Sequence, residues 1–328
     1  MKIERSCATA AGVKKVPGGQ RRIPYLLFLV TAVAAAVGAF ASPYGNQCGS
    51  TSLKAMANLA EGAKLRDNAS PASIILVTNT NDSGPGSLRQ ALADANDGDT
   101  IDATGVSGTI LLTSGELQIT HSVTINGPGA GNLAVNGNAN SRVFENFASD
   151  VTISGFTITN GSAFGGANGG GILNHGELTL SESSVSNSHT SHASGGGIFV
   201  DGGGTLTVTN GTISGNEVVP GEGGGIGNAT GATITVIDST ISGNGAYPGG
   251  GGIGGGGQVT VTNSTISGNS SERGSIFIIG GQMTIGDTIL KAGAVGGTIS
   301  NDGGTIASLG YNLANDAGGG VLTGPGDH

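Results

Sequence analysis

Charge, aromatic residues and cysteine are all scarce in this sequence. Among its 328 residues, 11% are charged, 4% are aromatic and none is Trp. The 13 Lys and Arg residues are too few to form the broad basic surface that nucleic-acid binding needs. Disordered chains carry more charge and fewer β-branched residues than this chain does. We therefore expect a folded protein that does not bind nucleic acid.

Glycine, in contrast, is abundant. The chain has 65 Gly residues but only 9 Pro, and the glycines follow no three-residue period, which excludes a collagen-like protein. There are only two cysteines, Cys7 and Cys48, and Cys7 lies in the leader segment described next. Cys48 then has no partner once the leader is removed, so no disulfide framework is expected.

The first 41 residues have the layout of a secretory signal peptide. Six basic residues lie within residues 1–22, an apolar run of 18 residues covers 23–40, and Ala39-Phe40-Ala41 closes it with a small-x-small cleavage pattern. An uncleaved membrane anchor is the alternative, because such a run is just long enough to span a bilayer. We expect cleavage, and hence a secreted or cell-surface protein, extracellular or on a bacterial outer membrane.

Cleavage after residue 41 leaves seven basic and 21 acidic residues, a net charge of −14. A chain this acidic is expected to be soluble and not to be drawn to anionic membranes. Membrane contact is therefore expected only through an uncleaved leader. We interpret residues 42–73 as a linker that is partly helical, over 52–66, or disordered.

From residue 148 onward the chain repeats at short intervals. Ile recurs with spacings of 26, 28, 27, 23 and 23 residues, in most cases directly after a Gly run, at Ile172, Ile198, Ile226, Ile253, Ile276 and Ile299. An alternating triplet in each unit ends on an apolar residue, at Ile153, Leu180, Val208, Val236, Val261 and Ile285. A second short strand has its apolar position at Ile158, Val185, Ile213, Ile241, Ile266 and Ile289.

This pattern predicts an all-β solenoid. Alternation with period two predicts short half-buried strands, and repeats of 20–50 residues indicate a solenoid or a propeller. Propeller blades need roughly 40–45 residues, more than these units offer. We therefore predict a parallel coil of about ten turns, in which each coil pairs with its neighbours and the apolar positions stack inside.

Asn follows the second strand in five units, at Asn160, Asn187, Asn216, Asn244 and Asn269. Asn tolerates left-handed backbone and bonds readily at turns. We predict that these side chains stack into a hydrogen-bonded ladder with a structural role, with a one-residue slip between the first two units and the last three.

Residues 74–147 are less regular but still contain strand-like segments. Ser87 follows Pro85-Gly86 as a helix N-cap, and Leu88, Leu92 and Ala95 share one face, which predicts a short capping helix over 87–96. A solenoid must close its open end. We therefore predict one domain over residues 74–328 with this helix at its N-terminal end.

The repeat resembles the right-handed parallel β-helix of the pectate-lyase-like superfamily. It is similar to the repeats of bacterial secreted proteins of the polymorphic outer-membrane type, through Gly223–Ile226 and the Ser-Thr-Ile-Ser-Gly-Asn segments Ser239–Asn244 and Ser264–Asn269. Residues 86–91 are similar to a Leu-Arg-Glu-Ala module, with Gln90 in place of Glu. The resemblance implies a single-stranded right-handed parallel β-helix over about residues 74–327, in proteins that are mostly secreted or surface-attached and have no assigned reaction.

The resemblance also implies that further coils normally follow a segment like residues 309–327, so we expect the domain to be truncated at its C-terminus. Residues 300–328 contain no amphipathic helix. An uncapped strand edge invites pairing with another chain. We therefore expect fraying beyond residue 300 and end-to-end self-association.

Motifs for catalysis are missing from the repeats. The resemblance implies two kinds of site for an enzyme of this fold. Hydrolases use paired Asp residues, and lyases use Ca²⁺-binding carboxylates together with a basic residue. Here no Asp-Asp pair occurs, and the basic residues are only Arg142, Arg273 and Lys291. His189-Thr190-Ser191-His192 lacks a third metal ligand. We predict no catalytic residue, no metal site and no cofactor.

The variable loops between the Asn positions and the Gly runs fall on one side of the predicted solenoid. Insertions of this kind often mark the binding face of a repeat protein. The candidate ligand-binding residues are therefore His189, His192, Glu217, Glu222, Tyr247, Glu272 and Arg273.

Three functions are compatible with these features. The leading hypothesis is a non-catalytic, adhesion-like or structural surface protein whose partner is a polysaccharide or a host or neighbouring cell surface. The alternative is a polysaccharide lyase or glycoside hydrolase of the pectate-lyase-like fold. The third, an ice-binding β-helix, rests on the outward pairs Thr207/Thr209 and Thr260/Thr262, which Ile237 and Gly286 interrupt in other coils.

Overall fold

The computed structural model describes residues 72–328. The predicted signal peptide, nearly all of the predicted linker with its helix over 52–66, and both cysteines lie outside the described residues. No helix within residues 72–328 is long and apolar enough to cross a membrane.

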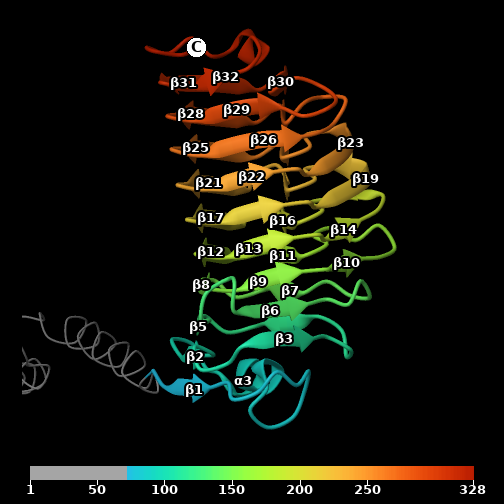
Figure 1. Cartoon of the computed structure of the whole chain (residues 1–328), viewed down its shortest axis with the longest axis vertical. Coiled ribbons are helices and arrows are strands. Elements are labelled where there is room, and N and C mark those ends of the chain that lie inside the picture. Colours follow the sequence, from blue (N-terminus) through green and yellow to red (C-terminus); the bar gives the residue numbers. More distant parts are fainter. Residues whose placement is uncertain (1–71) are drawn as a thin grey trace, which may run out of the picture. The chain divides into compact units, whose positions relative to one another are not determined.

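The described residues form a stack of coils whose strands line up in three long parallel sheets (Figure 1). Sheet A has ten strands: β1 (Ile74–Leu76), β2 (Thr100–Asp102), β5 (Thr124–Asn126), β8 (Val151–Ser154), β12 (Glu177–Ser181), β17 (Thr205–Thr209), β21 (Thr233–Ile237), β25 (Gln258–Thr262), β28 (Gln282–Gly286) and β31 (Thr305–Gly310). Sheet B has nine: β3 (Gly108–Leu111), β6 (Leu133–Asn136), β9 (Thr157–Thr159), β13 (Ser184–Ser186), β18 (Thr212–Ser214), β22 (Thr240–Ser242), β26 (Thr265–Asn269), β29 (Ile289–Ala292) and β32 (Leu313–Ala314). Sheet C has eight: β4 (Leu117–Ile119), β7 (Phe144–Asn146), β11 (Ile172–Asn174), β16 (Ile198–Val200), β20 (Ile226–Asn228), β24 (Ile253–Gly255), β27 (Ile276–Ile279) and β30 (Ile299–Asp302).

Each complete coil runs from sheet C to sheet A, then to sheet B, and back to the next strand of sheet C. Because all strand pairs of these sheets are parallel and one coil apart, the chain is a parallel β-helix, with about nine turns against the ten expected. In the middle coils the return segment carries a small lateral sheet D: β10 (Ser162–Ala163), β14 (His189–Thr190), β15 (Ala193–Ser194), β19 (Glu217–Glu222) and β23 (Gly245–Gly249).

The predicted interior columns are confirmed. One column of buried side chains, paired strand to strand along sheet A, consists of Ile153, Leu180, Val208, Val236, Val261 and Ile285. The sheet B column is also confirmed from Ile158 to Ile266. At its end the prediction is wrong: Leu290 pairs with Ile266 and is buried, whereas Ile289 is half-exposed. The strand is shifted by one residue there, which exchanges the inner and outer faces.

The Gly runs before sheet C are required by two different constraints. Gly223 adopts φ +68°, the left-handed conformation that Gly reaches without strain. A Cβ on the next residue, Gly224, would collide with the main-chain carbonyl oxygens of Gly245 and Gly251 in the following coil. The runs are therefore corners at which neighbouring coils pack backbone against backbone.

The predicted Asn ladder exists, but it has three members rather than five. Asn216 Nδ2 donates to Asn244 Oδ1 at 3.0 Å, and Asn244 Nδ2 donates to Asn269 Oδ1 at 2.9 Å, all within the buried interior. Asn160 and Asn187 instead occupy exposed left-handed corners with φ of +51° and +52°. The one-residue slip seen in the sequence therefore separates two different positions of the turn.

A second Asn pair, which the sequence reasoning missed, lies at the end of sheet C strands. Asn146 Nδ2 donates to Asn174 Oδ1 at 2.8 Å, and both residues are fully buried. Asn174 Nδ2 also donates to the carbonyl oxygen of Thr205 in the next coil at 2.9 Å. These bonds satisfy main-chain groups at the corner between sheets C and A.

The N-terminal end is closed by the predicted helix, α3 (Leu88–Asp94). Ser87 Oγ accepts the Gln90 N–H at 3.1 Å as the N-cap, and Leu88, Ala91 and Leu92 are buried.

Two carboxylates near this helix, those of Asp82 and Asp99, accept hydrogen bonds from the loops around it. Burial alone would raise the pKa of Asp82, but hydrogen bonds from Ser114, Arg89 and Thr113 outweigh it and hold that pKa well below its usual range. Main-chain N–H groups, first that of Asn96 and then that of Ser73, likewise lower the pKa of Asp99.

Two further carboxylates and a 3-10 turn, η1 (Gly318–Gly320), lie at the C-terminal end of the described coils. Asp316 accepts from Thr298 N at 2.7 Å and from Gly318 N at 2.9 Å. Asp327 accepts from Ser308 Oγ at 2.6 Å and from both nitrogens of Asn312. Burial opposes these bonds, but the bonds prevail and lower both pKa values. The predicted truncation, the fraying beyond residue 300 and the self-association stay predictions.

Asp82, Asp99, Asp316 and Asp327 are hereafter the end carboxylates. Each accepts main-chain N–H groups near one end of the described coils: Asp82 and Asp99 near the first strands, and Asp316 and Asp327 near the last ones. A solenoid is held by contacts between neighbouring coils, and these bonds add contacts within the outermost described coils.

Candidate functional site

The lateral sheet brings some of the predicted loop residues together. His189 on β14 pairs with Glu217 on β19, and His189 Nδ1 lies 3.8 Å from Glu217 Oε2. Both side chains are about half-exposed or more. This pair is a solvent-exposed contact, which contributes little to stability and leaves both groups open to a ligand.

A second group forms around Arg273. Its guanidinium carbon lies 4.7 Å from the ring centroid of the buried Phe277, and its Nη1 lies 3.7 Å from Asp302 Oδ2. Glu222 on β19 is partly buried nearby: burial raises the pKa of its carboxyl group, and the charge of Arg273 opposes that rise. Tyr247 stands half-exposed on β23, one residue before Pro248, whose carbonyl accepts the Arg273 N–H at 3.1 Å.

His192 and Glu272 join neither group. His192 is exposed at a left-handed corner with φ +58°, and Glu272 is exposed on the loop after β26. Within residues 72–328 no three His, Cys, Asp or Glu side chains stand close enough together to hold a metal ion. The predicted edge is therefore two small clusters and two isolated residues.

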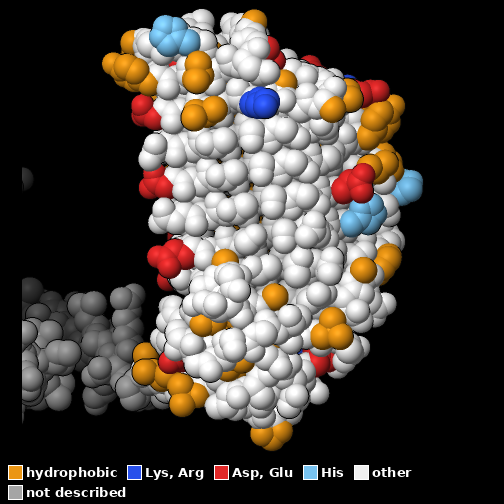
Figure 2. Space-filling model, in the orientation of Figure 1, with side chains coloured by type: hydrophobic (Ala, Val, Ile, Leu, Met, Phe, Trp, Pro, Cys, Tyr) orange, Lys and Arg blue, Asp and Glu red, His pale blue; other side chains and the backbone are white. Residues whose placement is uncertain are grey.

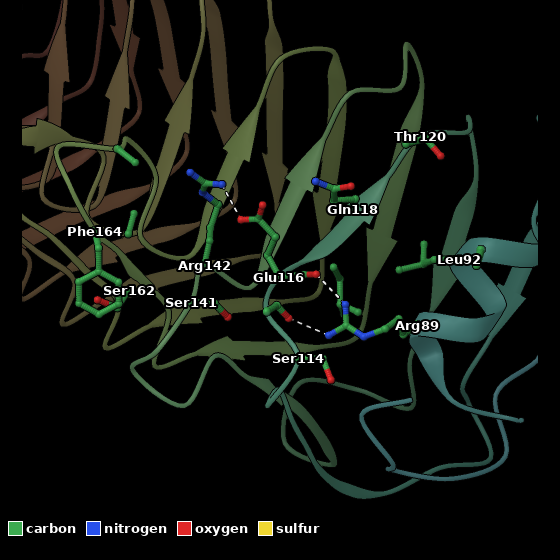
Figure 3. Close-up of a pocket in the computed structure, with 15 residues that line it drawn as sticks. Arg89, Leu92, Ser114, Glu116, Gln118, Thr120, Ser141, Arg142, Ser162 and Phe164 are labelled. Atoms are coloured by element: carbon green, nitrogen blue, oxygen red, sulfur yellow. Dashed lines mark hydrogen bonds and ion pairs between the residues drawn. The ribbon is translucent and has the colours of Figure 1, made fainter. Parts of the chain in front are cut away.

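A hollow that the sequence did not reveal lies at the N-terminal end of the same side. It has a volume of about 800 Å³ and lies between α3, strand β4, the residues before β7 and strand β10 of the lateral sheet (Figure 3). Its lining is mixed: Arg89, Leu92, Ala93, Ser114, Gly115, Glu116, Leu117, Gln118, Thr120, Ser141, Arg142, Ser162, Ala163, Phe164 and Ala167. We refer to it as the β4–β10 pocket.

Arg142 organises the floor of this pocket. It is 9% exposed, its Nη1 lies 2.6 Å from Glu116 Oε2 and 3.6 Å from Glu145 Oε1, and its Nε donates to the carbonyl oxygen of Gly169 at 3.0 Å. Burial raises the pKa of Glu116, Arg142 opposes that rise, and the adjacent Glu145 adds to it. Two carboxyl groups thus share one guanidinium, and Glu116 holds a proton more readily than an exposed glutamate does.

Arg89 fixes the segment before β4 that carries Glu116. It forms an ion pair with Asp82 at 2.7 Å and donates to the carbonyl oxygens of Gly115 and Glu116, both at 2.7 Å (Figure 3). The N–H donors of the Arg89 guanidinium group are therefore engaged by the protein itself. Arg89 acts as a positioning residue that links α3 to the residues just before β4.

A line of polar groups leads away from the pocket across sheet C. His175 Nε2 lies 3.4 Å from Glu145 Oε1, and His175 Nδ1 lies 3.0 Å from Asp201 Oδ2. The imidazole ring also stacks on Phe147, with centroids 5.0 Å apart and planes 13° from parallel. Charged groups from three successive coils are thus connected along the outward side of sheet C.

Two polar groups and one aromatic ring complete the pocket wall. Ser141 Oγ is buried and has no hydrogen-bond partner within the described residues. Ser162 is also buried, and the neighbouring Phe164 is 62% exposed at the rim (Figure 3). Ser162 and Phe164 thus place a hydroxyl residue and an aromatic ring on one wall of the pocket.

The sequence offered little signal for this pocket. Glu116, Arg142 and Glu145 come from two coils, and they lie in the irregular stretch before the clear repeat begins. Arg142 stood out as a rare basic residue, and Glu145 follows it by three residues, but only the register of β4 with β7 brings Glu116 to it. Two carboxylates on adjacent coils therefore lie close together although the sequence contains no Asp-Asp motif.

The outward faces of sheets A and B carry columns of hydroxyl groups. Thr207 and Thr209 pair with Thr235 and Ile237, so the predicted interruption on sheet A is real. On sheet B every outward position from β9 to β26 is Ser or Thr, and the middle of the face drawn in Figure 2 carries few coloured side chains. Outward hydroxyl residues are ordinary on strands, and we assign no function to them.

Comparison with known proteins agrees with the fold. Residues 171–327 match a family model described as the right-handed β-helix region. Among solved structures, the A-module of the mannuronan C-5 epimerase AlgE4 from Azotobacter vinelandii is 12% identical; the match covers 76% of this chain and 99% of that module, with a TM-score of 0.28. No curated protein matches the chain.

Proposed function

We propose that this right-handed parallel β-helix protein is a secreted or cell-surface protein that binds glycan without transforming it. The observation that carries the proposal is the β4–β10 pocket, which combines hydroxyl residues, the Arg142–Glu116 ion pair and an exposed aromatic rim. Small-molecule sites are concave and largely apolar, with a few convergent polar groups that orient the ligand. A sugar, with its hydroxyl groups and its C–H faces, suits such a lining.

The setting of the pocket supports an extended ligand. Strand β10, which forms one wall, is also the first strand of the lateral sheet, so the pocket continues into the edge that carries His189 and Glu217. A chain of sugars can therefore occupy the pocket with one end and the lateral sheet with the rest.

The hydrogen bonds of the two guanidinium groups favour glycan binding over a lyase reaction, which needs a basic residue. Arg89 and Arg142 both donate to main-chain carbonyls and to carboxylates of the protein itself. A guanidinium held this way keeps its proton and is not available as a base.

Glycan binding is tested by truncating the rim. Phe164→Ala removes the exposed ring, and we expect the affinity for a bound oligosaccharide to fall roughly tenfold in titration calorimetry, the effect of losing an aromatic anchor. Leu313→Ala is the matched control, because Leu313 is 55% exposed at the opposite end of the stack. Equal affinities for the two variants, or no binding to a broad glycan panel, would contradict the proposal.

A glycoside hydrolase is the second candidate, and one observation favours it. Glu116 and Glu145 face the same Arg142 nitrogen, and the pKa of Glu116 is raised by burial, as a general acid requires. If the pocket is catalytic, reducing ends will accumulate on incubation with a bound glycan, and both Glu116→Gln and Glu145→Gln will abolish their release while binding persists. Binding without any release supports the first candidate.

A further inference from the structure

The outward face of sheet B changes character in its last two coils. From β9 to β26 its outward residues are all Ser or Thr. The two strands that follow place Ile289 and then Leu313 in register with Thr265, and these two side chains are 51% and 55% exposed. Figure 2 shows hydrophobic side chains gathered at this end of the stack, above a face that carries few coloured ones. A hydroxyl-lined surface therefore ends in an apolar one.

The corner that leads from sheet A into this face changes in the same coils. In five successive coils its left-handed residue is polar: Glu182, Asn210, Asp238, Asn263 and Asp287. One coil later the same position is Tyr311, which has φ +57° and is 69% exposed. Asn and Asp adopt this conformation more readily than a bulky residue does, so the fold does not require Tyr here. Two residues earlier, Leu309 lies beside Gly286 and is 56% exposed.

We name Ile289, Leu309, Tyr311 and Leu313 the C-terminal patch. Four large side chains that are each more than half exposed present an apolar surface on the order of 400 Å². Patches of this size on a soluble protein commonly mark an interaction site. Two such patches in contact, together with the polar residues around them, bury about 1,000 Å², the size of a weak but specific interface.

The charges beside the patch make it complementary to itself. Asp287 precedes Ile289 by two residues at the corner, and Lys291 follows it by two residues on β29. Both charged side chains are exposed. Lys291 is also the one Lys or Arg within residues 72–328 that forms no ion pair. An acid and a base thus flank an apolar centre, each roughly 6–7 Å along the chain from Ile289.

This pattern finds its counterpart when a second copy lies alongside and points in the same direction. A two-fold axis parallel to the stack brings Ile289 against Ile289 and Leu313 against Leu313. The same rotation exchanges the two sides of the face, so Asp287 of each copy lies opposite Lys291 of the other. A two-fold contact requires a surface that is complementary to itself in this way. The Ser and Thr columns that continue the face are uncharged, so they add no repulsion between two acidic chains.

We infer that the C-terminal patch is the contact surface for a second copy of this chain in a parallel, two-fold dimer. The contact is lateral and is made by side chains, unlike the end-to-end strand pairing expected from the sequence. It leaves the β4–β10 pocket, at the other end of the stack, free in both copies, and it does not depend on glycan binding.

Sedimentation velocity of the purified whole protein, from about 1 to 200 µM, tests the contact. We expect a monomer–dimer equilibrium with a Kd on the order of 10 µM, as for other small interfaces. The double variant Ile289→Thr/Leu313→Thr gives both positions the residue type that the preceding coils carry, so it should keep native circular dichroism. It should weaken dimerisation at least about tenfold, because it removes the apolar centre of the contact.

Val295→Thr is the matched control for the apolar change, because Val295 is a 54% exposed residue in the loop after β29 and outside the patch. It should leave the Kd unchanged. A wild-type protein that stays monomeric throughout, or a dimer whose Kd the double variant does not raise, would overturn the inference. A monomer that instead sediments with phosphatidylcholine vesicles would assign the patch to a lipid surface and would overturn it as well.

Charge reversal tests the two-fold arrangement. Asp287→Lys places Lys opposite Lys, and Lys291→Asp places Asp opposite Asp, so each variant alone should dimerise several-fold more weakly at low salt. An equimolar mixture of the two should recover the wild-type affinity, because the mixed dimer pairs Lys with Asp at both places. Asp238→Lys is the matched control, an exposed residue at the same corner two coils earlier with the same φ of +51°. Failure of the mixture to recover, or an equal loss in the control, would overturn the two-fold dimer.

Discussion

Replacing Asn244 by Ala removes the middle member of the buried ladder. Its Oδ1 accepts from the main-chain N of Asn216 at 2.9 Å and from Asn216 Nδ2 at 3.0 Å. Its Nδ2 donates to the carbonyl oxygen of Ile213 and to Asn269 Oδ1, both at 2.9 Å. The substitution therefore removes four hydrogen bonds and links three coils less tightly.

The expected cost follows from these bonds. A typical intramolecular hydrogen bond contributes about 1 kcal/mol net, and a buried donor left without a partner costs about 1–3 kcal/mol. The main-chain N–H of Asn216 loses its acceptor, whereas Asn216 Nδ2 keeps the carbonyl oxygen of Val185 at 3.0 Å. We expect Asn244→Ala to lower the free energy of unfolding by roughly 3–5 kcal/mol.

Asn187→Gly is the matched control for this measurement. Asn187 is an exposed Asn at the equivalent corner one position earlier, with φ +52°, a conformation that Gly adopts freely. We expect it to change stability by no more than about 0.5 kcal/mol. Urea unfolding followed by far-UV circular dichroism gives both values. A loss below about 1 kcal/mol in Asn244→Ala, or equal losses in the two variants, would refute the assignment of the ladder to the inner position.

Two further changes probe the ends and the corners of the stack. The end carboxylates have pKa values below those of the unfolded chain, so their contribution is present above about pH 4 and is lost as the pH falls through the folded-state values. The melting temperature should therefore fall steeply between pH 6 and pH 2. Asp327→Asn should melt at a lower temperature than wild type at pH 6, and its melting temperature should fall less between pH 6 and pH 2. Parallel plots of melting temperature against pH for the two proteins would contradict this. Gly224→Ala places a methyl group against the carbonyl oxygens of Gly245 and Gly251 and should cost at least about 3 kcal/mol in urea unfolding. Gly243→Ala, whose Cβ meets open space but whose φ is +63°, should cost only about 1 kcal/mol; similar losses would show that close approach is not the constraint.

The regular part of the fold could be predicted because the chemistry of each position repeats. In a stack of parallel strands, alternate residues face the interior, and the residue one coil later lies directly above. Leu180, Val208 and Val236 could therefore be assigned to one column from spacing alone. The same logic failed at Ile289, where a one-residue shift of the strand turned Leu290 inward instead.

The ends of the stack were less predictable. The helix at Leu88–Asp94 has a local signal, the Ser87 cap, and it was predicted correctly. The hydrogen bonds at the C-terminal end depend on Asp316 and Asp327, single carboxylates whose partners lie 15–19 residues earlier or within their own turn. Nothing in the local sequence distinguishes such a carboxylate from an ordinary surface aspartate.

By itself, then, the sequence determined the repeat, the direction in which strand residues face and the corners where Gly and Asn are needed, because those properties depend on neighbours along the chain and on a constant coil length. Only the tertiary structure decided which charged groups meet. Arg142 contacts Glu116 from the preceding coil and the carbonyl oxygen of Gly169 from the following one, and each of these is 26 or 27 residues away. Coulombic and hydrogen-bonding energies depend on distances of a few ångströms, and such distances are set by loop paths between α3, β7 and β10 that no residue pattern specifies.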